Sequence, residues 1–108
     1  MRLSDLVTEL TGTYRKHGWQ LRRVLLRPQS QEDLDLAESF GDEVSVQESE
    51  IDAMWFSRPS NNGREAWELR QLTETPFALF ETFEKDEAEE EREDVRREME
   101  ARIRDAGC

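Results

Sequence analysis

The chain has 108 residues, of which 38% are charged and 35% hydrophobic, and its net charge is −11. This length fits a single domain, residues 1–108, and the acidic balance disfavours a nucleic-acid partner because it repels phosphate. Three Trp and five Phe argue against disorder, since disordered chains are poor in aromatic residues. With Cys108 as the single cysteine, an intramolecular disulfide and a thiolate metal cluster are both excluded.

The N-terminal quarter predicts a helix followed by a strand. Leu3, Val7, Leu10 and Tyr14 recur at helical spacing, and Gly18 is placed to end the helix, which we expect over residues 5–17. Residues 19–26 are dominated by Trp, Val and Leu and stop before a proline, so they predict a strand.

The next segment is acidic. Residues 31–40 follow a serine and carry apolar residues near one helical face, which predicts a short acidic helix. Val44 and Val46 alternate with polar residues, but the alternation changes parity before Ile51, so the chain must turn or bulge within residues 47–50.

Residues 51–83 predict an antiparallel meander. Predicted strands at 51–58 and 65–72 flank the turn sequence of residues 59–63, whose Asn-Gly supplies the positive φ of a reversal. A second reversal at residues 73–76 leads to a predicted strand at 77–83.

From about residue 86 the composition is helical and highly charged. Three glutamates each stand four positions before an arginine, the favourable orientation for ion pairs along a helix, at positions 93, 98 and 100. Val95, Met99 and Ile103 form a narrow apolar stripe. The sequence therefore predicts an α+β fold: an antiparallel sheet of about four strands, with the N-terminal helix, the acidic helix and a C-terminal helix over 86–106 packed on one face.

Charge is distributed unevenly along the chain. Residues 1–30 carry a net charge of +4 and residues 31–52 a net charge of −9, whereas residues 53–80 balance and residues 81–108 carry −6. We expect the basic strand 19–27 and the acidic segment 31–52 to lie near each other and to neutralise one another, in preference to an exposed basic patch.

Motifs for catalysis are missing. The glycines match no phosphate loop, one histidine cannot build a histidine-rich zinc site, and the start of a calcium loop at Asp33 fails where glycine is required. His17 falls among helix-terminal cations, where its positive form complements the helix dipole. We therefore name no catalytic residue, no metal ligand and no cofactor, and the sequence favours a non-enzymatic role without excluding an enzyme.

The aromatic and arginine residues supply the candidate sites. Interface or pocket candidates are the large apolar residues of the meander and the last helix: Trp55, Phe56, Trp67, Leu69, Phe80, Met99 and Ile103. Candidates for contact with an anion are four arginines, which can make bidentate contacts: Arg22, Arg58, Arg64 and Arg70.

Two functions from different classes follow. The first is a small acidic protein-interaction module, an adaptor, chaperone-like or regulatory protein, that forms a homodimer and binds a further protein partner. Its basis is a sheet too apolar for so charged a chain, with one face left uncovered. The alternative is a small-molecule binding protein or minor enzyme with an aromatic and arginine-lined pocket between sheet and helices. Since no signal peptide or apolar membrane span is visible, we expect a cytoplasmic protein without a membrane partner.

Overall fold

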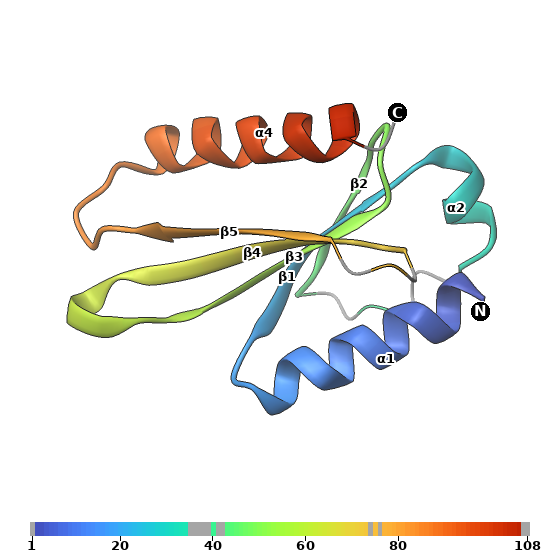
Figure 1. Ribbon diagram of the computed structural model, residues 1–108, viewed down its shortest axis with the longest axis horizontal. Helices are drawn as coiled ribbons and strands as arrows, with labels where there is room; N and C mark the ends of the chain where they lie inside the picture. Colours follow the sequence, from blue (N-terminus) through green and yellow to red (C-terminus); the bar gives the residue numbers. More distant parts are fainter. Residues whose placement is uncertain (1, 35–39, 41–42, 74, 76, 107–108) are drawn as a thin grey trace.

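A computed structural model of the protein describes residues 2–34, 40, 43–73, 75 and 77–106. The fold is α+β, with a mixed sheet of five strands between two long helices (Figure 1). The elements in chain order are α1 (Leu3–Lys16), β1 (Gln20–Leu26), α2 (Pro28–Glu32), β2 (Ser45–Glu48), β3 (Ala53–Pro59), the 3₁₀ turn η1 (Asn61–Gly63), β4 (Glu65–Gln71), β5 (Ala78–Phe83) and α4 (Glu89–Ala106).

The strand order is β2-β1-β3-β4-β5. β1, β3, β4 and β5 are antiparallel neighbours, as the sequence predicted, but β2 adds a fifth strand and lies parallel to β1. The predicted α+β class is confirmed, but the prediction of about four antiparallel strands missed one strand and its parallel pairing. β2 has only four residues, which are largely exposed at a sheet edge, so the alternation of Val44 and Val46 was too short to predict a strand.

The segment between β1 and β2 differs from its prediction as well. Helix α2 begins at Pro28, a residue suited to the first helical position, and ends at Glu32, whereas the predicted acidic helix covered residues 31–40. Residues 35–39 of that predicted helix lie outside the described residues. Leu34 and Phe40 on either side of them are both buried.

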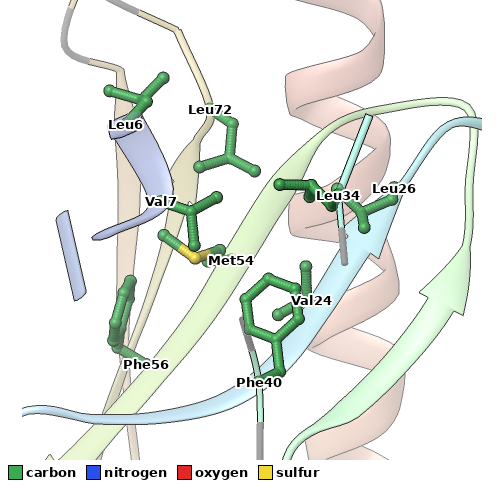
Figure 2. Close-up of a cluster of buried hydrophobic side chains, with 9 residues drawn as sticks. All are labelled: Leu6, Val7, Val24, Leu26, Leu34, Phe40, Met54, Phe56 and Leu72. Carbon is green, nitrogen blue, oxygen red and sulfur yellow. The ribbon is translucent and has the colours of Figure 1, made fainter. Parts of the chain in front are cut away.

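One core lies between the sheet and α1. Leu6 and Val7 of α1 meet Val24 and Leu26 of β1 and Met54 of β3, and Figure 2 shows these side chains converging with Leu34, Phe40, Phe56 and Leu72. The apolar stripe of α1 is thus buried against the sheet, as its helical spacing predicted.

A second core lies on the opposite face. Met99 and Ile103 of α4 pack on a cluster of sheet and loop residues: Leu25, Ile51, Ala53, Trp55, Trp67, Leu69 and Phe83. Figure 1 shows α4 and α1 on opposite sides of the sheet, so the prediction that the helices pack on one face was wrong. The face that was expected to be uncovered is the one that α4 covers.

The β3–β4 hairpin forms at the predicted turn. Asn62 has φ 61° and Gly63 has φ 75°, which are the left-handed values expected of the Asn-Gly pair. A Cβ atom at Gly63 would stand 2.9 Å from Cδ of the exposed Lys85, whose flexible side chain would have to move aside, so the positive φ is the main reason for glycine here.

Strand β1 contains an irregularity where it pairs with β3. Leu21 is opposite Phe56 and Arg23 is opposite Trp55, so Arg22 is an extra residue in the ladder. As a consequence Leu21 faces α1, whereas Arg23 faces α4.

Candidate functional site

Most of the predicted interface residues belong to the two cores. Phe56 packs on the α1 side; the others on the α4 side are Trp55, Trp67, Leu69, Met99 and Ile103. These six side chains are at most 5% exposed, so they are not available to a partner of the folded chain. Phe80 differs, because 56% of it is exposed.

Phe80 lies at the end of a row of four aromatic rings on the α1 side of the sheet. Phe56 stacks on Tyr14 with 4.0 Å between ring centroids, Tyr14 meets Trp19 at 6.2 Å, and Trp19 meets Phe80 at 6.2 Å. We name this set, Phe56, Tyr14, Trp19 and Phe80, the aromatic row. It runs from a buried ring on β3 to an exposed ring on β5.

Polar groups hold the aromatic row in place. The guanidinium of Arg58 lies 4.6 Å from the centroid of the Trp19 ring and donates a hydrogen bond to the carbonyl of His17 at 3.0 Å. Burial, and after it a hydrogen bond with the Glu68 carboxylate, raises the pKa of the Tyr14 hydroxyl. Tyr14 is therefore a neutral, fixed support for Trp19 and not an acid or base near neutral pH.

The edge of the sheet next to Phe80 is formed by β5. Within the described residues β5 pairs only with β4, so its outer side is an unpaired edge. Ala78 and Glu81 on this strand are exposed, and Phe77 just before it is 38% exposed. Exposed aromatic surface and free backbone groups thus occur together at β5.

The four predicted anion-contact arginines do not come together. Arg58 packs on Trp19, and Arg64 forms an ion pair with Glu84 at 3.0 Å beside the β3–β4 hairpin. Arg70 is 7% exposed and donates hydrogen bonds to the carbonyls of Gln71 and Thr73. Arg22 alone lies on the α4 side, at the β1 bulge.

A different group of charges gathers beneath the first turns of α4. Arg23 donates two hydrogen bonds of 2.9 Å to the Glu93 carboxylate, and Arg96 contacts Glu93 at 2.9 Å and Glu89 at 2.6 Å. The Arg96 guanidinium lies 4.0 Å from the Trp67 ring centroid, and this residue is 1% exposed. The Arg23 hydrogen bonds, with help from Arg96, lower the pKa of Glu93 to about 2.

A cavity of about 460 Å³ adjoins this charge cluster. It is lined by Arg22, Arg23, Glu43, Ser45, Glu65, Trp67, Glu89, Arg92 and Arg96. Three of its arginines already bind carboxylates, since Arg92 contacts Glu65 at 3.5 Å. We name it the arginine cavity.

Local patterns in the sequence did not predict this cluster of charges around Glu93. Glu93 stands four residues before Arg97, which predicted an ion pair along the helix, but its carboxylate binds Arg23 of β1, 70 residues away. That contact depends on the placement of α4 over β1 and on the bulge that turns Arg23 toward it. The run Arg22-Arg23 beside the aromatic residues was the only signal in the sequence.

The acidic segment and the basic strand are neighbours where the structure describes them. β2 lies beside β1, and the Asp52 carboxylate accepts hydrogen bonds from the Arg27 backbone at 2.8 Å and from its side chain at 3.0 Å. Ser30 also donates to Asp52, at 2.7 Å. Asp52 therefore fixes the start of α2 on the end of β1.

Among the described residues, no helix is both long and apolar enough to cross a membrane, and no three His, Cys, Asp or Glu side chains are grouped so that they could hold a metal ion. Cys108 lies outside the described residues. Comparison of the chain with protein-family models, with curated proteins and with solved structures finds no match.

Proposed function

We propose that this protein is a non-enzymatic protein-interaction module that binds an extended segment of a protein partner along the free edge of β5. A strand added at a sheet edge forms main-chain hydrogen bonds with it, and side chains on the two faces decide which segment fits. The observation that carries the proposal is Phe80, which is 56% exposed on an edge strand and lies at the end of the aromatic row.

The side chains that pack beside Phe80 support the proposal that its exposed ring serves to bind a partner. Trp19 contacts Phe80, and Arg58 and Tyr14 in turn support Trp19. A partner side chain that packs on Phe80 would therefore meet a preorganised aromatic surface, which reduces the entropic cost of binding. Aromatic residues, phenylalanine included, are enriched at protein interfaces, and the residues that carry most binding energy lie in well-packed surroundings.

A nuclear magnetic resonance titration with short capped peptides tests the proposal. One peptide alternates valine with lysine, and its matched partner alternates valine with glutamate. We expect the lysine peptide to bind more tightly, because the protein carries a net charge of −11, and to shift the amide signals of Ala78, Phe80 and Thr82. The variant Phe80→Ser should weaken this binding, and Phe77→Ser should weaken it less. Absence of shifts along β5 with both peptides, together with absence of self-association, would remove the proposal.

The arginine cavity favours a second candidate function, the binding of a small aromatic anion. Trp67 provides a ring wall, and Arg22 forms no ion pair with another described residue. Glu89 is 69% exposed where it contacts Arg96, so a ligand carboxylate could replace it without loss of a buried group.

Thermal denaturation with benzoate or inorganic phosphate tests this second candidate. Binding to the native state raises the melting temperature by mass action, and we expect Arg22→Gln to abolish that rise. Arg64→Gln is the control, since Arg64 pairs with Glu84 outside the cavity. Equal shifts in both variants, or no shift with either anion, would exclude the cavity as a binding site.

A further inference from the structure

The backbone of β5 presents its free groups at alternate residues. The amide of Gln71 donates to the carbonyl of Phe77 at 3.0 Å, so Phe77 turns its backbone groups toward β4. Because this direction alternates along an antiparallel strand, Leu79, Glu81 and Phe83 also bond to β4, whereas Ala78, Phe80 and Thr82 turn theirs outward. The outward amide of Thr82 already has a partner, the Glu81 carboxylate at 3.1 Å.

From this pattern we infer that the strand received at the β5 edge is β5 of a second copy of this chain, antiparallel, with the twofold axis at Phe80. This inference rests on the proposed function, whose partner it identifies. In this register Phe80 lies opposite Phe80 of the second copy, and Ala78 lies opposite Thr82 of the second copy. All three outward residues of each strand then find hydrogen-bonding partners.

Other registers of the same pair are poorer. A slip that opposes outward residues with inward ones forms no ladder at all. An axis at Glu81 sets two glutamates directly opposite each other at the closer, non-hydrogen-bonded spacing, which is destabilising. An axis at Leu79 leaves Thr82 without a partner in the strand. The axis at Phe80 instead places Glu81 opposite Leu79 of the second copy.

The side chains fit this register on the α1 side of the sheet. Phe80 and its symmetry mate become cross-strand neighbours, so two aromatic rows join into one and the exposed area of both Phe80 rings falls. Two features oppose the pairing. Glu81 must leave the Thr82 amide, and two chains of charge −11 repel one another.

Because of these opposing features, we expect the dimer to be weak, to depend on salt concentration and to respond to substitution of Glu81. Sedimentation velocity from about 5 to 500 µM protein should show a shift from the 12.8 kDa chain toward twice that mass. The shift should occur at lower protein concentration in about 0.5 M salt than in about 0.1 M salt, since salt screens the repulsion. Glu81→Gln should tighten the dimer severalfold, because it removes a charge from the edge.

A matched pair of variants at Thr82 tests whether the dimer forms through the β5 edge. Thr82→Pro deletes an outward N–H that β4 does not use, so we expect a folded chain whose dimer is at least about tenfold weaker. Thr82→Val keeps the N–H and should dimerise like the unmodified chain. A folded Thr82→Pro variant with undiminished dimerisation would overturn the inference.

Amide hydrogen exchange of the unmodified protein supplies a readout that does not depend on variants. Raising the protein concentration should slow exchange at Ala78, Phe80 and Thr82 and leave Leu79 and Glu81 unchanged, since β4 already protects the latter. A monomer at every concentration and both salt levels, without such protection, would exclude the second copy. The peptide titration would then decide separately whether β5 receives a different strand.

Discussion

Among the described residues, the layer between α1 and the sheet and the layer between α4 and the sheet each bury nine hydrophobic residues, but the two helices contribute differently. α1 is anchored by aliphatic contacts centred on Leu6 and Val7. α4 buries only Met99 and Ile103 fully among its apolar residues, and a fully buried Arg96 joins them. Hydrogen bonds from Arg23 and Trp55 to glutamates of α4 complete its attachment. A helix with a narrow apolar stripe can therefore cover a sheet face when the sheet offers cations and indole N–H groups to its carboxylates.

Substitution of one buried methionine in each layer gives the most direct comparison of how much the two layers contribute to the free energy of unfolding. Met54 lies on β3 against α1, and Met99 lies on α4. Methionine-to-alanine changes in a core cost about 2 to 5 kcal/mol. We expect Met54→Ala to cost the upper part of this range and Met99→Ala the lower part, because α4 can move to fill the space whereas a central strand cannot.

Urea denaturation of both methionine variants measures the difference. Because Met99 is 3% exposed inside the chain, its variants report on α4 packing and not on a helix-mediated dimer. A larger cost for Met99→Ala would show that hydrocarbon contacts, and not charges, hold α4.

The next largest effect on the free energy of unfolding is expected from substitution of Arg96. Arg96→Ala removes its packing on Trp67 and leaves space behind, and we expect it to cost about 2 to 4 kcal/mol. Arg96→Met should cost less than half as much, because an apolar side chain of similar volume keeps the contact and removes a buried charge. Equal costs for the two variants in urea denaturation would indicate that the charge itself stabilises the fold.

Acid should weaken the α4 layer through Glu93. Its pKa is lowered to about 2 from an ordinary value of 4.5, so the stabilisation is complete above pH 4.5 and is lost as the pH falls from there through 2. At neutral pH we expect Glu93→Gln to cost about 1.5 to 3 kcal/mol, the usual contribution of hydrogen bonds to charged groups.

The difference between Glu93→Gln and the unmodified chain should shrink as the pH falls toward 2. Denaturation at a series of pH values measures it, with Glu84→Gln as the control at the exposed Arg64–Glu84 pair. A pH-independent difference would mean that Glu93 acts through packing and not through its charge.

The smallest effect is expected at an ion pair outside both layers. Arg64 and Glu84 are 44% and 57% exposed, so water and salt screen their attraction. We expect Arg64→Gln to change the unfolding free energy by less than about 0.5 kcal/mol. A larger change would show that charges stabilise the β3–β4 hairpin. The exposed ion pair would then contribute to stability as the buried pairs under α4 do.

Local patterns were sufficient for most elements of this fold. The predicted strand over 65–72 and the helix over 86–106 correspond to β4 (Glu65–Gln71) and α4 (Glu89–Ala106), because alternation and helical composition act over neighbouring residues. The parallel pairing of β2 with β1 was not predictable in this way, since the four residues of β2 show little burial of their own.

One overlooked signal concerned the two covered faces. Residues 53–56 form an unbroken apolar run, and all of them are buried in β3, which is typical of a strand covered on both sides. That run argued against a bare sheet face. The candidate sites were harder to predict, because the contact of Arg23 with Glu93 and the meeting of Trp19 with Phe80 depend on how distant elements are placed.

The extra residue in β1 lets a single strand contribute to both layers in turn. Before it, Trp19 and Leu21 lie on the α1 side, where Trp19 supports the exposed edge. At and after it, Arg22 and Arg23 each lie 6.0 Å from the Trp67 ring on the other side. If Arg22 were instead paired in a regular ladder, plain alternation would place Trp19 and Leu21 on the α4 side together with Arg23. Arg22, as the extra residue, thus determines that the hydrophobic side chains at the start of β1 and the arginines that follow them lie on opposite faces of the sheet.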